Sequence, residues 1–186
     1  MRTAVVILNW NTEGFLKEFL PGLISSVGKV DGAEVVVADN ASTDGSLRVM
    51  QEEFPQVKTI VLDKNYGFTG GYNKAFEALY GSTGSPKEDA PEYFLLINSD
   101  IEVNDGWLQP LVDWMDSHPG CGACAPKLHS WQERDKFEYA GAAGGYLDMF
   151  GYPFCRGRIL SRLEQDKGQY DSPADVLWAT GACLLV

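Results

Sequence analysis

Three polar residues, Asn98, Ser99 and Asp100, directly follow the apolar run FLLI at residues 94–97. Such a run is typical of a strand buried on both faces in the middle of a parallel sheet. Ligands of open α/β sheets bind just beyond the carboxyl ends of the strands. Asn98 and Asp100 share one side of the strand because side chains alternate. Mg²⁺ prefers oxygen ligands and commonly binds one or two carboxylates together with substrate phosphates, so we predict a divalent metal, Mg²⁺ or Mn²⁺, at Asp100.

A second apolar run, residues 34–40, ends in Asp39 and Asn40 and is followed by Ser42 and Asp44. No basic residue lies near Asp39 in the sequence, so a structural salt bridge would need a distant partner. Carboxylates at one sheet edge repel each other unless a cation or a hydrogen-bond donor lies between them. We therefore treat Asp39 as a functional candidate. For Ser42 and Asp44 a helix cap is as good an explanation as a binding role.

Two further strand ends carry polar residues or glycines. The first strand ends in Asn9, Trp10 and Asn11, and the third is followed by NYGFTGGYN at residues 65–73. Helix N-termini and closely approaching glycine backbone bind phosphate oxygens. This segment lacks the Gly-Lys-Ser/Thr of a P-loop, and alone it is more often a tight loop than a phosphate site.

The elements that must position these residues alternate between strand and helix patterns. Pro21 should kink or divide the first helix, which Asn11 or Thr12 would cap. The loop at residues 81–91 reads as flexible, and the segment at 151–173 as irregular. The alternation predicts an α/β fold, a mostly parallel twisted sheet with helices on both faces. We expect strands at residues 3–10, 34–40, 57–63, 94–97, 121–128 and 175–186, and helices at 15–27, 42–54, 71–80 and 105–118.

Composition limits the classes of protein. The 186 residues favour one domain, and 45% hydrophobic content allows a sizeable core. A net charge of −11 argues against nucleic-acid binding. No apolar run is long enough to span a bilayer, and the N-terminus reads as a strand rather than a signal peptide. Four cysteines suggest a reducing compartment, so we expect a cytoplasmic protein, free or at the inner face of the membrane. The abrupt C-terminus suggests a cut inside a longer chain.

Four motifs together resemble a known family: VVILNWN, VVVADNASTDGS, NYGFTGGYN and FLLINSDIEV, in this order and spacing. They resemble the nucleotide-sugar half of a family 2 glycosyltransferase of the rhamnosyltransferase-like branch, with a Rossmann-like GT-A fold. The similarity covers about residues 3–186. It implies one nucleotide-sugar-binding domain, 1–186, with a donor-binding part at about 1–104 and the start of an incomplete acceptor-side part at about 105–186.

The resemblance also implies roles for residues. Asp39 would accept the N3–H of uracil or thymine, and Asn98-Ser99-Asp100 stands where the family carries its Asp-x-Asp motif. Because an amide replaces the first acid, we expect an ion held mostly by Asp100 and the diphosphate. The general base is expected beyond Val186, and no catalytic residue is assigned within the chain. The residues implied for the donor nucleotide are Asn9, Trp10, Asn11, Asp39, Asn40, Ser42, Asn65, Gly67, Phe68, Gly71, Asn73, Asn98 and Ser99.

The stretch LWATGACLLV resembles the family segment beside the donor sugar and the acceptor. It would give Trp178, Thr180 and Gly181 a binding role; a buried strand that bulges at glycine is the alternative. Other signals are discounted. Cys121 and Cys124 read as buried, unreactive thiols rather than a redox or zinc motif.

The resemblance implies an inverting enzyme that moves a sugar from a UDP or dTDP donor to a hydroxyl of a surface glycan or lipid-linked saccharide. A non-catalytic nucleotide-sugar-binding module is the alternative. A sugar nucleotidyltransferase is a weaker one, because NWNTEGFLKEF is not the glycine-rich basic loop that such enzymes carry after the first strand.

Overall fold

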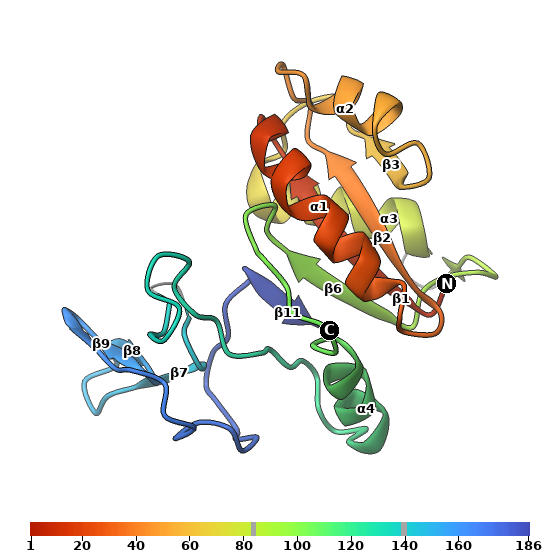
Figure 1. Cartoon of the computed structure of the whole chain (residues 1–186). Coiled ribbons are helices and arrows are strands. Elements are labelled where there is room, and N and C mark those ends of the chain that lie inside the picture. Colours follow the sequence, from red (N-terminus) through yellow and green to blue (C-terminus); the bar gives the residue numbers. More distant parts are fainter. Residues whose placement is uncertain (83–84, 139–140) are drawn as a thin grey trace.

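A computed structural model describes residues 1–82, 85–138 and 141–186 of the chain (Figure 1). Its main sheet has five strands in the order β11-β6-β1-β2-β3. The strands β1, β2, β3 and β6 are parallel, and β11 runs antiparallel to β6 at one edge. The predicted mostly parallel sheet is therefore confirmed. The strand bounds are β1 Thr3–Asn9, β2 Ala33–Asp39, β3 Lys58–Val61, β6 Tyr93–Ile97 and β11 Cys183–Leu185.

Helices cover both faces of this sheet, as predicted. Three of them, α1 (Glu13–Val27), α2 (Ser46–Glu52) and α4 (Gln109–Ser117), share one buried core with alternate strand residues such as Val5, Ile7 and Leu95. The helix α3 (Gly67–Tyr80) packs on the other face, against the strand residues that point to that side, such as Ala4, Val6 and Val36. Side-chain alternation in strands that are buried on both sides produces these two cores.

Pro21 does not divide the first helix, which was one of the two predicted outcomes, because α1 is continuous from Glu13 to Val27. Proline removes one backbone hydrogen bond and crowds the preceding turn. Pro21 is on the exposed face, whereas Leu20 and Leu23 are buried beside it. Packing of that buried face outweighs the local cost. The helix α3 also differs from the prediction, since it begins at Gly67, four residues before the predicted start.

The segment predicted to be irregular holds most of a second sheet. Its four antiparallel strands lie in the order β10-β9-β8-β7, with bounds β7 Gly145–Leu147, β8 Pro153–Cys155, β9 Arg158–Ile159 and β10 Arg162–Leu163. We call residues 145–163 the β-lobe. Strands of two or three residues are too short to show an alternating pattern. Phe137 fills the small core beneath the lobe, and a Cβ on Gly157 would lie 2.4 Å from its ring.

Two other predicted segments differ. Residues 121–128 form no strand; their pairing with the sheet is the single bridge between Cys124 and Leu185. The predicted flexible loop at 81–91 includes residues 83 and 84, which lie outside the described residues. On either side of them, β4 (Gly81–Ser82) pairs with β5 (Ser85–Pro86). Within the described ranges, no helix is long and apolar enough to cross a membrane.

Candidate functional site

The predicted site residues that follow β1, β2, β3 and β6 lie at the carboxyl edge of the main sheet. Asn9 and Asp39 are partners in the register of β1 and β2. The N–H of Asn98 donates to the carbonyl of Ala182 at 2.9 Å. Next to it, a Cβ on Gly181 would lie 3.1 Å from the ring of Phe68. The chain leading into β11 therefore lies between the end of β6 and the first turn of α3, and the structure brings together segments that are far apart in sequence.

Asp39 lies at the centre of a buried network. Its Oδ2 accepts a hydrogen bond of 2.8 Å from the Asn9 amide, and its Oδ1 accepts one of 2.9 Å from the N–H of Ser42. The Asn9 amide also donates to the Ser42 hydroxyl at 3.0 Å. The relative exposure of Asp39 is 0%. Protein donors satisfy the carboxylate here, and a ligand could reach it only if the residues above it moved.

Asn11 and Ser42 join the two loops above this network. The Asn11 side chain accepts a 2.7 Å hydrogen bond from the N–H of Thr43, and the Ser42 hydroxyl accepts one of 3.0 Å from the N–H of Asn11. Asn11 adopts a positive φ of 56°. Asp44 accepts hydrogen bonds from the N–H groups of Glu13 and Ser46, the first residues of α1 and α2, although the N-cap residues of these helices are Thr12 and Gly45. Trp10 remains exposed at the rim of this edge.

The N-terminus of α3 is held by two asparagines. Asn40 accepts a 2.9 Å hydrogen bond from the N–H of Tyr66 and donates to the side chain of Asn65 at 3.0 Å. Asn65 in turn accepts from the N–H of Gly67 at 2.7 Å. The next two N–H groups, those of Phe68 and Thr69, belong to the first turn, which an α-helix leaves without intrahelical partners. This first turn is therefore fixed in place and able to bind an anion.

The remaining predicted residues of α3 differ in exposure. Gly71 is buried, and a Cβ there would lie 2.7 Å from a methyl group of Leu8. Phe68 is 52% exposed and packs edge-on against Tyr72, with ring centroids 5.0 Å apart. Asn73 is exposed one turn further along. Phe68 and Asn73 are thus the exposed side chains and Gly71 is the buried position among these residues.

The polar turn after β6 could supply some, but not all, of the ligands of a metal ion. Asp100 is exposed, and neither it nor the Asn98 side chain has a hydrogen bond or ion pair among the described residues. The same ranges contain no group of three or more His, Cys, Asp or Glu side chains that could hold a metal ion. One free carboxylate with neighbouring amide and hydroxyl oxygens suits an ion whose other ligands are water and phosphate.

Trp178 and Thr180 have structural contacts in this chain. The indole of Trp178 lies against Gly145, where a Cβ would be 1.9 Å from the ring, and its Nε1 donates to the carbonyl of Tyr146 at 3.2 Å. The Thr180 hydroxyl accepts from the N–H of Ala182 at 3.1 Å. Gly181 lies against Phe68. Trp178 thus anchors the β-lobe, while Gly181 belongs to the carboxyl edge.

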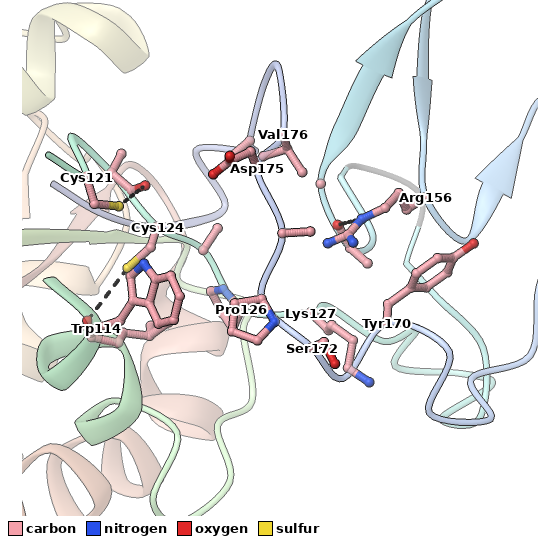
Figure 2. A pocket seen from close by; sticks show the side chains of 18 of the residues that line it. Trp114, Cys121, Cys124, Pro126, Lys127, Arg156, Tyr170, Ser172, Asp175 and Val176 are labelled. Carbon is pink, nitrogen blue, oxygen red and sulfur yellow. Dashed lines mark hydrogen bonds between the residues drawn. The ribbon is translucent and has the colours of Figure 1, made fainter. Parts of the chain in front are cut away.

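A cavity of about 940 Å³ lies away from this edge, and none of the predicted donor-nucleotide residues line it (Figure 2). It lies between α4 with the following segment and the base of the β-lobe, and Trp114, Lys127, Arg156 and Tyr170 are among its lining residues. The Arg156 guanidinium stacks over Tyr170 at 5.1 Å and donates to the carbonyl of Ala143. Sequence reasoning missed this cavity because its walls come from three distant segments.

The prediction that Cys121 and Cys124 are buried is wrong, because both side chains are only partly buried. All four cysteines are free, and Cys183 is buried. Burial raises the pKa of Cys124 to about 11 and that of Cys183 to about 12. These two thiols are therefore protonated and unreactive at neutral pH.

Comparisons with known sequences agree with the resemblance. Residues 4–172 match Glycosyl transferase family 2. The chain is 26% identical over 192 residues to the N-acetylglucosaminyl-diphospho-decaprenol L-rhamnosyltransferase of Mycobacterium tuberculosis; the alignment covers 98% of this chain and 60% of that protein. It is 26% identical over 119 residues to the poly(ribitol-phosphate) beta-glucosyltransferase of Bacillus spizizenii, covering 61% of this chain and 17% of the relative. The chain thus spans 60% of the length of the mycobacterial relative.

Solved structures show the same fold. S. aureus TarS in complex with UDP-GlcNAc superposes with a TM-score of 0.52 at 26% identity, covering 69% of this chain and 34% of that chain. The mannosyltransferase PcManGT from Pyrobaculum calidifontis, in complex with GDP-Man and Mn²⁺, gives a TM-score of 0.51 at 23% identity over 68% of this chain and 35% of that one. The predicted GT-A glycosyltransferase fold is confirmed. With a family match that extends over most of its length, the chain belongs to glycosyl transferase family 2.

Proposed function

We propose that this chain is the nucleotide-sugar-binding part of an inverting glycosyltransferase that uses a UDP- or dTDP-sugar. The acceptor would be a hydroxyl of a surface glycan or lipid-linked saccharide. The observation that carries the proposal is the position of Gly181 and Ala182, which contact Phe68 on α3 and Asn98 after β6. The first turn of α3, with the N–H groups of Phe68 and Thr69, and the carboxylate of Asp100, which has no partner among the described residues, thus flank one segment at the ligand-binding edge of the sheet.

Each part of the edge has a task in this proposal. The N–H groups of Phe68 and Thr69 bind the diphosphate, and Asp100, with Asn98 and Ser99 beside it, helps to hold a divalent cation. When bound, that ion neutralises charge on the departing diphosphate. Asp39 accepts from the pyrimidine N3–H once the loops that carry Trp10 and Ser42 open. Trp10, Asn11 and Asn73 lie around the nucleoside and donor entrance.

Three finer points belong to the same proposal. The donor-binding part would occupy about residues 1–104 and the beginning of the acceptor-side part about residues 105–186. The name of the mycobacterial relative supports a rhamnosyl donor and a lipid-linked acceptor. We place the enzyme in the cytoplasm, at the inner face of the membrane, where such acceptors would be met.

Calorimetry with UDP, dTDP, ADP and GDP, each with and without Mg²⁺ or Mn²⁺, tests the proposal. We expect the two pyrimidine nucleotides to bind more tightly and only with metal. Asp100→Asn should weaken metal-dependent binding by about 2 kcal/mol, the size of one charge-assisted contact. Asp105→Asn is the matched control, because Asp105 is an exposed carboxylate in the same loop that pairs with Lys29. Purine nucleotides that bind as tightly, or an Asp100 variant that binds normally, would contradict the assignment.

A further inference from the structure

The end of the β-lobe exposes large apolar side chains. In the turn between β7 and β8, Met149 is 89% exposed, Phe150 77% and Tyr152 70%. In the turn between β9 and β10, Leu160 is 89% exposed. Single exposed apolar residues are normal on protein surfaces, but a contiguous group marks an interaction site.

The topology places these two turns together. The four strands form an antiparallel meander in sequence order, so every second connection lies at the same end of the sheet. The turn at residues 148–152 and the turn at 160–161 are therefore neighbours, and the connection at 156–157 lies at the opposite end. We call these two turns the lobe tip. In Figure 1 the strands β8 and β9 lie far from the helices α1–α3.

The longer turn of the lobe tip is well ordered. The carboxylate of Asp148 accepts hydrogen bonds from the N–H groups of Phe150 and Tyr152, at 2.8 and 2.9 Å. The N–H of Asp148 also donates to the carbonyl of Tyr152 at 2.9 Å. These bonds fix the backbone, so the apolar side chains project from a preformed turn. Preformed contacts lose less entropy on binding than flexible ones.

Charge distinguishes the β-lobe from the rest of the protein. Residues 145–163 contain Arg156, Arg158 and Arg162 and one acidic residue, Asp148, which gives a net charge of +2 in a chain of −11. Arg162 has no hydrogen bond or ion pair among the described residues, and it lies one residue from the tip. A second copy docked tip to tip would bring the two Arg162 side chains toward each other.

We propose that the lobe tip docks on a membrane surface that contains anionic lipids. Met149, Phe150, Tyr152 and Leu160 would enter the interface between headgroups and acyl chains, and Arg162 would interact with the lipid phosphates. The acidic body would be repelled by the same surface, so the molecule would bind with the lobe tip toward the lipid. This goes beyond the proposed sugar transfer, and vesicle binding can be measured without donor or acceptor.

Flotation with vesicles tests the proposal. The protein should bind vesicles of phosphatidylcholine mixed with phosphatidylglycerol more tightly than phosphatidylcholine alone, and salt should weaken the difference. The double variant Met149→Ser with Leu160→Ser should reduce binding at least about tenfold, because it removes two large apolar groups from the interface. Val61→Ser, an exposed apolar residue at the end of β3, is the matched control and should bind normally.

Two further variants test the role of the Arg162 charge and the insertion of the lobe tip into the bilayer. Arg162→Gln should weaken binding to anionic vesicles, whereas Lys58→Gln, an exposed cation on β3, should not. In the Phe150→Trp variant, lipids with brominated chains should quench the fluorescence of the introduced tryptophan. No vesicle binding, or binding that the tip variants leave unchanged, would overturn the proposal. Self-association in sedimentation velocity that the tip changes abolish, without quenching by brominated lipid, would also overturn it and would make the tip an interface between copies.

Discussion

At the scale of single residues, the carboxylate of Asp39 has two roles to reconcile. It is satisfied by Asn9 and Ser42, and it lies at the edge where the nucleoside is expected. A carboxylate has about four acceptor positions, so two protein donors leave capacity for a third hydrogen bond. The Asn9 amide, at the end of β1, would still hold the carboxylate after the Ser42 loop opens, so a pyrimidine ring would find its acceptor already oriented.

Asp39→Asn should therefore affect both folding and binding. An amide offers one acceptor and one donor, so its NH₂ group would face the donor of either Asn9 or Ser42 in a buried site. We expect the free energy of unfolding in urea to fall by about 1–3 kcal/mol, the usual cost of an unsatisfied buried polar group. UDP binding should weaken as well. Asp63→Asn, an exposed carboxylate one strand further along, should change stability little. Unchanged stability of the Asp39 variant would contradict the buried network.

At the scale of elements, the start of α3 shows what the sequence could and could not predict. The apolar spacing within residues 71–80 indicated the helix, because Tyr72, Ala75 and Leu79 recur on one face. The first turn depends on the hydrogen bonds of Asn40, which is 26 positions before Tyr66 in the chain. Such a contact between distant residues leaves no local pattern in the sequence.

The other differences between prediction and structure have related causes. The main sheet and the four polar strand ends were predictable, because long apolar runs and their ends are local signals. The β-lobe was not, because its strands are two or three residues long and are stabilised by Phe137 and Trp178 from outside it. The closed state of Asp39 was not predictable either, since it depends on the register of β1 and β2.

Two helical glycines offer a matched pair of substitutions. Replacing an exposed helical glycine by alanine stabilises a helix by about 0.5–1 kcal/mol. Gly22→Ala in α1 should do so, because no atom lies within 4 Å of the added Cβ. Gly71→Ala in α3 should have the opposite sign, because its Cβ would lie 2.7 Å from Leu8 and 3.1 Å from the amide of Asn40. We expect a loss of about 1–3 kcal/mol in chemical unfolding, as for other overpacked core sites. If Gly71→Ala stabilised the protein as Gly22→Ala is expected to do, Leu8 would be able to move aside.

At the scale of the whole molecule, two parts have cores of unequal size. The main sheet buries two apolar layers, whereas the buried cluster beside the β-lobe consists, within the described ranges, of Phe137, Ala142 and Ala143 with three partly buried neighbours. Polar contacts therefore matter more for the smaller part. Asp166 follows β10, the last strand of the β-lobe, at the base of the lobe. It accepts hydrogen bonds from Lys127 and His129 at 2.6 and 2.8 Å. These contacts join the segment after α4 to the segment after β10.

The Asp166 contacts predict a specific sensitivity to acid. The hydrogen bond from Lys127 is the main cause that lowers the pKa of Asp166 to about 2, from 3.8. Because the folded pKa is depressed, the stabilisation is complete above the unfolded value near 4 and is lost as the pH falls toward 2. Asp166→Asn should lower the melting temperature at pH 6, and the difference from the unaltered protein should shrink between pH 4 and about 2. Taking the difference between the melting temperatures of the variant and of the unaltered protein removes the contribution of the other carboxylates.

The control is Asp175→Asn, which changes an exposed carboxylate in the segment before β11. Its melting temperature should follow that of the unaltered protein at every pH. A difference that stays constant with pH would mean that the side chain stabilises the lobe base by packing and not through its charge.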